Sequence, residues 1–96
     1  MDFLVSIEVN WPPSNDERQK VELIAAEASR ARQLANEGVL VRLWRIPGRW
    51  ANVGIWRAEN ATRLDEAIRS LPMSPWLDVT VVSLADHPSD PGQVQT

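Results

Sequence analysis

The order of strand-like and helix-like hydrophobic patterns constrains the fold more than any other feature of this sequence. Four segments alternate, or stay apolar, over the length of a strand: residues 3–10, 39–46, 50–58 and 77–84. Two longer segments repeat apolar residues every three or four positions: residues 15–37, and a second from residue 60 or 62 to 71. The order β-α-β-β-α-β predicts an α+β, ferredoxin-like fold. In this fold both helices cover one face of a four-stranded antiparallel sheet.

Local signals mark the ends of these segments. Ser14 and Glu17 have the spacing of a capping box, which satisfies free amide groups at a helix start. Gly38 follows the first helical segment, as a helix stop usually requires. The link at residues 47–49 contains Pro and Gly and predicts a hairpin between the two middle strands. Pro72 ends the second helix.

A chain of 96 residues has the length of one domain. We expect this single ferredoxin-like domain to occupy residues 1–86. Residues 87–96 hold prolines, a glycine and polar side chains. We expect them to form a C-terminal tail that is loose or packed on a neighbouring subunit.

The two middle strands are apolar on both sides, although the helices can cover only one side. Alternation divides the second strand into Val39, Val41 and Leu43 against Leu40, Trp44 and Ile46. It divides the third strand into Ala51, Val53 and Ile55 against Trp50 and Trp56. An uncovered face with two or three Trp would be a large exposed patch, which usually marks an interface or a ligand site. We therefore expect a homo-oligomer. Coverage by the tail and loops alone is the alternative.

Composition excludes several kinds of site and partner. There is no Cys, so disulfides, thiolate nucleophiles and zinc-thiolate clusters are excluded. With one His and no metal-ligand or cofactor fingerprint, we expect neither a metal nor a cofactor. The net charge is -3 without a basic run, so nucleic acid is not an expected partner. The sequence also has no signal peptide and no apolar stretch of membrane-spanning length, which predicts a cytoplasmic protein without membrane contact.

The single histidine, His87, lies between Asp86 and Ser89. Residues this close in sequence seldom form a hydrolytic triad. We expect His87 to cap the last strand or to line a subunit contact instead.

Glu27 is the clearest local candidate for chemistry. Steps of three and four connect Ile24, Glu27, Ala31 and Leu34, so a carboxylate lies in the apolar stripe of the first helix. Burial raises a carboxyl pKa, and a raised pKa suits a general base near neutral pH. The alternative is a Glu at the edge of the stripe that reaches water or pairs with Arg30 or Arg42.

The hairpin at residues 42–52 is the second candidate. It concentrates cations, indole rings and one amide: Arg42, Arg45, Arg49, Trp44, Trp50 and Asn52. Arg binds carboxylates through a planar fork, Trp offers an apolar wall with one N–H donor, and Asn offers a donor and an acceptor. These groups together suit a small, flat, anionic ligand. The alternative is a hairpin that pairs its Arg with acidic residues and packs its Trp on a neighbouring subunit.

The chain resembles the muconolactone isomerase family from its N-terminus to about Ser89. The most specific match is Leu43-Trp44-Arg45-Ile46, followed by Gly48 and Ala51-Asn52. Shorter matches are Phe3, Val5, Val9, Pro12, Leu23, Ala25, Glu27, Leu34, Glu37-Gly38, Leu71-Pro72, Pro75, Asp78 and His87-Pro88-Ser89. The resemblance covers almost the whole chain.

This resemblance implies a ferredoxin-like subunit in a ring-like homo-oligomer, a decamer. It implies a cofactor-free isomerase of the 3-oxoadipate pathway of aromatic catabolism, which moves a double bond in a carboxymethyl butenolide lactone. Glu27 matches the family's proposed base. The reaction would need oxyanion donors, such as Asn52, Trp44 or Trp50. It would also need a cation for the carboxylate arm, from Arg42, Arg45 or Arg49.

Two positions depart from the family pattern. Ile24 stands where the family commonly has Lys, and Trp50 where it commonly has Tyr. These changes leave the base but alter the assisting groups, so the natural substrate and its stereochemistry stay open. One alternative is a diverged dehalogenase that removes a proton and chloride from a chlorinated lactone. The other is a non-catalytic protein that binds small acids or serves in assembly.

Overall fold

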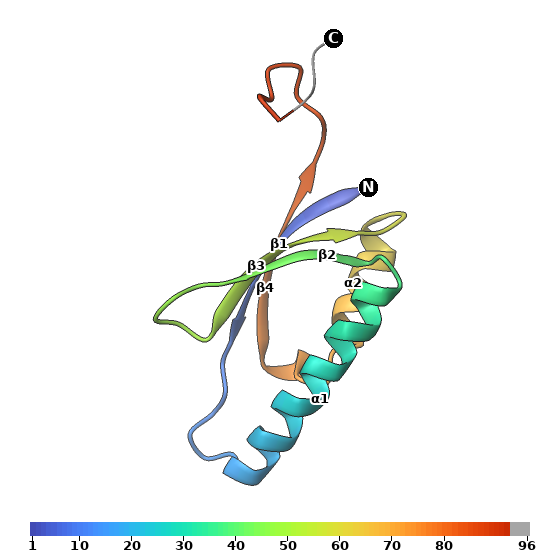
Figure 1. Ribbon diagram of the computed structural model, residues 1–96. Helices are drawn as coiled ribbons and strands as arrows, with labels where there is room; N and C mark the ends of the chain where they lie inside the picture. Colours follow the sequence, from blue (N-terminus) through green and yellow to red (C-terminus); the bar gives the residue numbers. More distant parts are fainter. Residues whose placement is uncertain (93–96) are drawn as a thin grey trace.

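The computed structural model describes residues 1–92 and confirms the predicted α+β fold (Figure 1). Its strands are β1 (Asp2–Val9), β2 (Leu40–Arg45), β3 (Ala51–Arg57) and β4 (Leu77–Leu84). Its helices are α1 (Glu17–Asn36), α2 (Ala61–Arg69) and a short 3-10 helix (Ser74–Trp76). The element order is therefore β-α-β-β-α-β, with the 3-10 turn immediately before the last strand.

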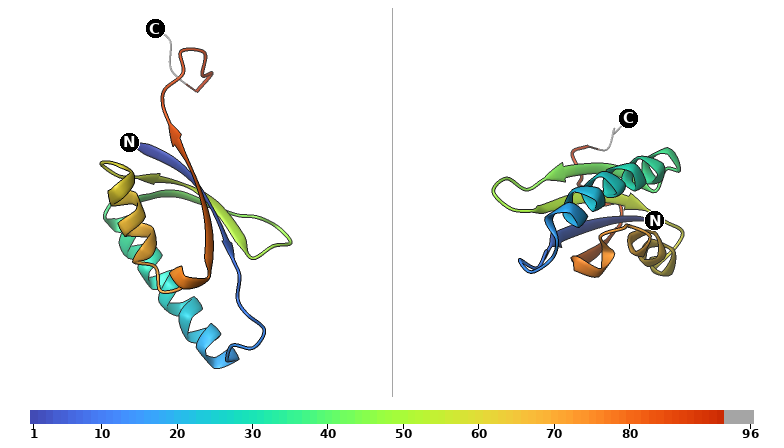
Figure 2. Two further views of the ribbon diagram at one scale, coloured as in Figure 1. Left: turned by 180° about the vertical axis from the view of Figure 1, so that it is seen from behind. Right: turned by 90° about the horizontal axis from the view of Figure 1, so that it is seen from below.

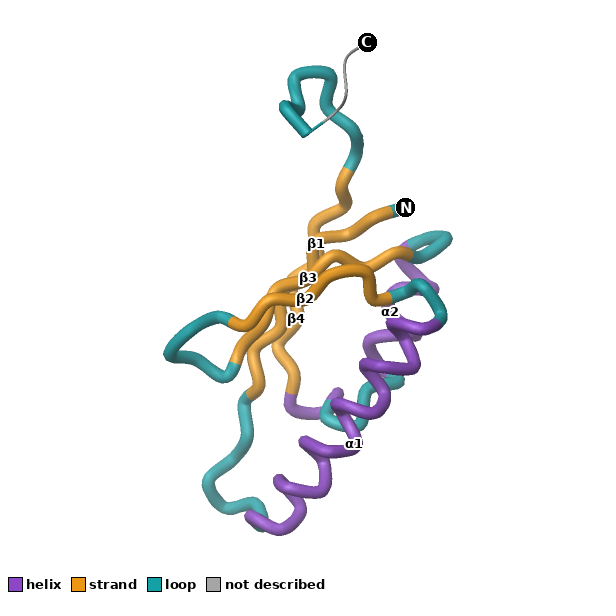
Figure 3. Tube along the Cα trace, in the orientation of Figure 1, coloured by secondary structure: helices purple, strands orange, loops and turns teal. Residues whose placement is uncertain are grey.

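All neighbouring strands pair antiparallel, in the order β2-β3-β1-β4. Both helices lie on one face of this sheet, as the two further views show (Figure 2). The tube in Figure 3 shows that the opposite face carries no helix. The predicted arrangement of helices and sheet is therefore confirmed.

The core lies between the sheet and the helices. The strands contribute Phe3, Val5, Ile7 and Trp56, and the helices with the segment after α2 contribute Leu34, Leu64, Ile68 and Leu71. The β1 side chains alternate, so every second one faces this layer. In α1 only Leu34, near its C-terminal end, is fully buried. The N-terminal part of α1 therefore contributes little to the core.

The helix starts differ in how well the sequence predicted them. The capping box at Ser14 and Glu17 was wrong, because Asp16 caps α1 and its side chain accepts a hydrogen bond from the backbone N–H of Arg18 at 2.8 Å. Asn60 caps α2 in the same way, and Asn60 was one of the two helix starts predicted from the sequence. Gly38 lies just after the C-terminal end of α1 and has a positive φ of 79°, a conformation that favours glycine.

A bulge in β2 overturns the predicted facing of that strand. Leu40 pairs with Trp56, but the next paired residue is Arg42, opposite Ile55. The extra residue shifts the alternation, so Leu43 lies opposite Gly54 on the helix side of the sheet. A Cβ at Gly54 would lie 2.5 Å from the Arg42 carbonyl oxygen, so only glycine allows this close approach.

The expected apolar patch on the open face exists, but it has a different composition. Of Trp44, Trp50 and Trp56, only Trp44 lies on that face, where it is 43% exposed. Trp56 is only 2% exposed on the helix side. The open face also exposes Val82 and Leu84 of β4. The patch is thus aliphatic with a single indole ring.

The chain does not form a compact sphere. Its radius of gyration is 15.2 Å, whereas about 12 Å is typical of a compact domain of this length. The hairpin and the segment after β4 both extend away from the layered body (Figure 1). Residues 85–92 form this projecting segment, and the last four residues of the predicted tail lie outside the described part. Among the helices of residues 1–92, none is long and apolar enough to span a membrane.

Candidate active site

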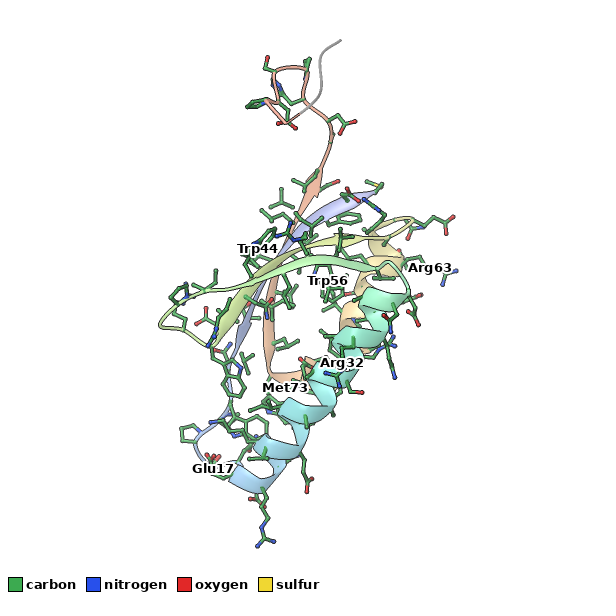
Figure 4. The ribbon with its side chains drawn as sticks, viewed as in Figure 1. Glu17, Arg32, Trp44, Trp56, Arg63 and Met73 are labelled. Carbon is green, nitrogen blue, oxygen red and sulfur yellow. The ribbon has the colours of Figure 1, made fainter. Side chains whose placement is uncertain are left out.

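A cavity of about 250 Å³ lies between α1 and the sheet. Its wall is formed by α1, all four strands with the residue before β3, and the segment between α2 and β4. The residues with chemical or shape-determining roles are Ile24, Glu27, Trp50, Asn52, Trp56 and Met73. Figure 4 shows Trp56 and Met73 between the sheet and α1. The cavity is mostly apolar, with a few polar groups, as small-molecule sites usually are.

The course of α1 explains why a cavity forms at this place. Leu34 fixes the C-terminal end of α1 in the core, while the N-terminal end points away from the strands (Figure 1). Between these ends, the small residues Ala28 and Ala31 line the cavity. A larger side chain at either position would fill part of this space. The helix thus opens a space beside the sheet instead of closing on it.

Glu27 lies on the wall of this cavity and is half-buried. Its Oε1 accepts a hydrogen bond from the backbone N–H of Met73 at 3.1 Å. Burial raises the pKa of the Glu27 carboxyl group, and the Met73 hydrogen bond opposes that rise only in part. The carboxylate is therefore held in place and is a stronger base than an exposed one.

Glu27 does not pair with either of the two Arg that the sequence offered as partners. Arg30 donates hydrogen bonds to Ser70 and Gln33 instead. Arg42 lies over the ring of Trp44 at 4.7 Å from its centroid. Among residues 1–92, the ion pairs present do not include Glu27. Neither oxygen of the carboxylate therefore has a charged partner among these residues.

Two polar atoms in the cavity wall lack hydrogen-bond partners in the described chain. They are Oδ1 of Asn52 and Nε1 of Trp56, and both are buried. Burying an unpaired polar group costs about 1–3 kcal/mol. Both residues lie on β3 at positions of the same parity, so both belong to the helix side of the sheet. The cavity therefore combines a base with one unsatisfied donor and one unsatisfied acceptor.

The remaining residues proposed from the sequence lie outside the cavity. Trp44 is on the opposite face of the sheet (Figure 4), where Arg42 covers its ring. Arg49 forms an ion pair with Glu8. Arg45 borders a shallow surface at the hairpin tip. Within one chain the structure brings together Glu27, Trp50 and Asn52, and a role in substrate binding for the other four stays a prediction.

Sequence reasoning missed three residues near the cavity. Trp56 lies four residues after Asn52 in the same predicted strand, so the two side chains point to the same face of the sheet. This alternation would have identified Trp56. Lys20 lies on the Ile24 and Glu27 stripe of α1, seven residues before Glu27. The hydrogen bond from Met73 uses its backbone, so no signal in the sequence predicts it.

The described residues include no cluster of His, Cys, Asp and Glu suited to a metal ion. His87 lies in the projecting segment, where its Nδ1 accepts a hydrogen bond from the Ser89 backbone N–H at 2.9 Å. His87 is not among the residues that line the cavity.

Comparison with known proteins identifies the family. The family model for muconolactone delta-isomerase matches residues 1–90. Muconolactone Delta-isomerase 2 of Acinetobacter lwoffii is 36% identical over 89 residues, which cover 93% of each chain. Muconolactone Delta-isomerase of Pseudomonas putida is 33% identical, again with 93% of each chain covered. A crystal structure of muconolactone isomerase superposes with a TM-score of 0.88 at 31% identity, over 100% of both chains.

These similarities define a small isomerase with a ferredoxin-like fold. The chain belongs to the muconolactone delta-isomerase family and is an enzyme of that type. A dehydrochlorinase from Burkholderia phenoliruptrix has a TM-score of 0.68 with this chain, but only 14% identity. That likeness shows a shared fold alone.

Proposed function

We propose that the protein is a cofactor-free isomerase that moves a double bond in muconolactone or a close carboxymethyl butenolide relative. The observation that carries this proposal is the position of Glu27. Its half-buried carboxylate has no charged partner, a raised pKa, and a place on the wall of a small cavity. Such a group is suited to accept a proton from carbon and to return it.

The proposed reaction has two proton transfers. The Glu27 carboxylate removes a proton from the ring carbon next to the conjugated lactone, and the C–H bonding electrons delocalise into a dienolate. The protonated Glu27 then delivers a proton two carbons away, which restores the carboxylate and completes the shift of the double bond. One carboxylate serves both steps if the intermediate stays bound, and no oxidant or reductant is needed.

The dienolate places negative charge on the carbonyl oxygen of the lactone, and this oxygen needs a hydrogen-bond donor. Asn52 is the candidate, because its amide group lies on the cavity wall and its oxygen has no partner. Rotation of the amide exchanges its NH₂ and carbonyl positions, so either can face a ligand. Trp56 adds a buried N–H without a partner.

We also propose that the domain at residues 1–86 assembles into a cytoplasmic homo-oligomer, a decamer, with the tail packed on a neighbouring subunit. Support comes from the uncovered face around Trp44 and Val82, which is apolar and exposed. The projection of residues 85–92 away from their own domain suits a contact with a second copy. Arg42, Arg45 and Arg49 would then be available to contacts between subunits.

The direct test is to mix the purified protein with muconolactone and to follow the ultraviolet spectrum as the double bond moves. We expect turnover without added metal or cofactor, and no turnover of any butenolide would contradict the proposal. A 5-chloro lactone serves as the comparison substrate. Chloride release in preference to isomerisation would instead favour the dehalogenase alternative, and binding without proton exchange would favour the non-catalytic one.

A further inference from the structure

The cavity lacks a positive charge of its own. None of its lining residues is Lys or Arg, and Glu27 is its only charged group in the described chain. The substrate class of the proposed function, on which this inference rests, carries a carboxylate arm. Moving that arm toward Glu27 without a cation would bring two negative charges together, which is unfavourable in a partly buried site. Binding of the carboxylate arm therefore requires a cation at the edge of the cavity.

Lys20 lies at that edge. Its Nζ is 5.1 Å from the centroid of the Trp50 ring, and Trp50 is part of the cavity wall. Steps of four and three residues lead from Lys20 through Ile24 to Glu27, so all three share one stripe of α1. Lys20 thus reaches from α1 toward the hairpin beside the cavity.

The other contacts of Lys20 are weak. Its nearest acidic partner is Glu17, at 3.9 Å, and that side chain is 79% exposed. Exposed pairs of this kind contribute only about 0–1 kcal/mol. Lys20 is also in the first turns of α1, where the helix dipole disfavours a cation. Helix stability therefore does not account for a Lys here.

We propose that Lys20 binds the carboxylate arm of the substrate at the edge of the cavity, while Glu27 acts on the lactone ring. The step of seven residues from Lys20 to Glu27 corresponds to about 10 Å along the helix axis. Lys20 can then contact the carboxylate of the arm while Glu27 contacts the ring carbon to which the arm is attached. This spacing also lets one helix position both the anion-binding group and the base, with Trp50 as the apolar wall beside the ammonium group.

The test compares Lys20→Met with wild type on muconolactone and on its methyl ester, which lacks the negative charge. We expect Lys20→Met to raise KM for the acid about tenfold, the loss typical of a hydrogen bond to a charged group. We expect kcat to change less than about twofold, because the ammonium group binds the carboxylate arm equally well in the ground state and in the transition state. The KM for the ester should not change. Lys20→Arg should restore most of the affinity for the acid.

The matched control is Arg18→Met, which removes one positive charge two residues away on an exposed side chain. It should leave both KM values unchanged, so an equal effect of Arg18→Met and Lys20→Met would overturn the inference. Equal losses of Lys20→Met on acid and ester would overturn it as well, while the proposed function would stand. Absence of wild-type turnover would contradict the proposed function and this inference together.

A binding measurement separates contact from a general effect on folding. Lys20 is the only lysine in the sequence, so selective isotope labelling gives one side-chain ammonium signal in NMR spectra. Addition of the acid to Glu27→Gln, which should bind without turnover, should shift this signal, and the ester should shift it much less. No shift with either ligand would overturn the inference.

Discussion

The carboxylate of Glu27 accepts a hydrogen bond from the backbone N–H of Met73, 46 residues later in the chain, at 3.1 Å. Met73 follows Pro72 and is itself 2% exposed, so the donor is held on a rigid and buried segment. This hydrogen bond restricts rotation of the Glu27 carboxylate. It therefore fixes the direction from which a proton can reach the carboxylate. The rest of the wall is apolar enough to raise the Glu27 pKa despite this hydrogen bond.

The pH dependence of activity should report this pKa. Because burial raises the Glu27 pKa above its ordinary value of 4.5, the basic form is lost at a higher pH than in an exposed Glu. We predict that kcat/KM falls on the acid side with an inflection above that ordinary value. A profile that stays flat down to the ordinary value would contradict the assignment of Glu27 as base.

The same pKa affects stability in the opposite direction. The folded protein binds this proton more tightly than the unfolded chain, so the contribution of Glu27 is most favourable below its ordinary pKa. That contribution is lost as pH rises through the raised value. Glu27→Gln should remove this dependence, and urea unfolding at acidic and neutral pH measures it. An unchanged difference between the two conditions in the variant would contradict the expectation.

Trp56→Phe separates catalysis from packing. The benzene ring of Phe leaves part of the space of the indole ring empty, and the unpaired indole N–H is removed. We expect the free energy of unfolding to fall by about 1–3 kcal/mol, with the fold retained. If the N–H donates to the dienolate, kcat should fall about tenfold or more. An unchanged kcat would leave Asn52 as the oxyanion donor.

Gly54→Ala tests the β2 bulge. The added Cβ would meet the Arg42 carbonyl oxygen at 2.5 Å, so the two strands must separate. We expect a loss of about 1–3 kcal/mol in the free energy of unfolding, measured by urea titration. Gly48→Ala is the comparison, because its φ of 79° is unfavourable for Ala while open space surrounds the new methyl group. No loss of stability in Gly54→Ala would contradict the described register.

Trp44→Glu tests the proposed assembly through the open face. Trp44 is 43% exposed in the single chain, so a charge there should leave the fold intact, as judged by circular dichroism. It should weaken an interface that buries the ring, and light scattering should show a smaller mass. Val21→Glu, at an exposed position on α1, is the control and should not change the mass. An unchanged mass for Trp44→Glu would place the interface elsewhere.

The order of the elements could be predicted because each hydrophobic period belongs to one kind of structure. The facing of β2 could not be predicted by simple alternation, because one inserted residue reverses it. Gly54 within a strand was the available warning, since such a glycine often marks a bulge or a close approach.

The candidate site was predictable in part. Glu27 followed from its place in an apolar helix stripe, and Asn52 from its hairpin. The three Arg of the hairpin were grouped because they are close in sequence, yet Arg49 pairs with Glu8 and Arg42 covers Trp44. The hydrogen bond from Met73 to Glu27 depends on tertiary structure alone, so no local sequence pattern predicts it.

The most direct test of the account is the rate of muconolactone isomerisation by Glu27→Gln, measured beside Glu22→Gln. Glu22 is exposed on the same helix, so it controls for the loss of one negative charge. Removal of a general base typically costs about 10²–10⁴-fold in rate. We predict a loss of that size in Glu27→Gln, near wild-type rates in Glu22→Gln, and retained folding in both. A folded Glu27→Gln variant with unaltered activity would contradict it.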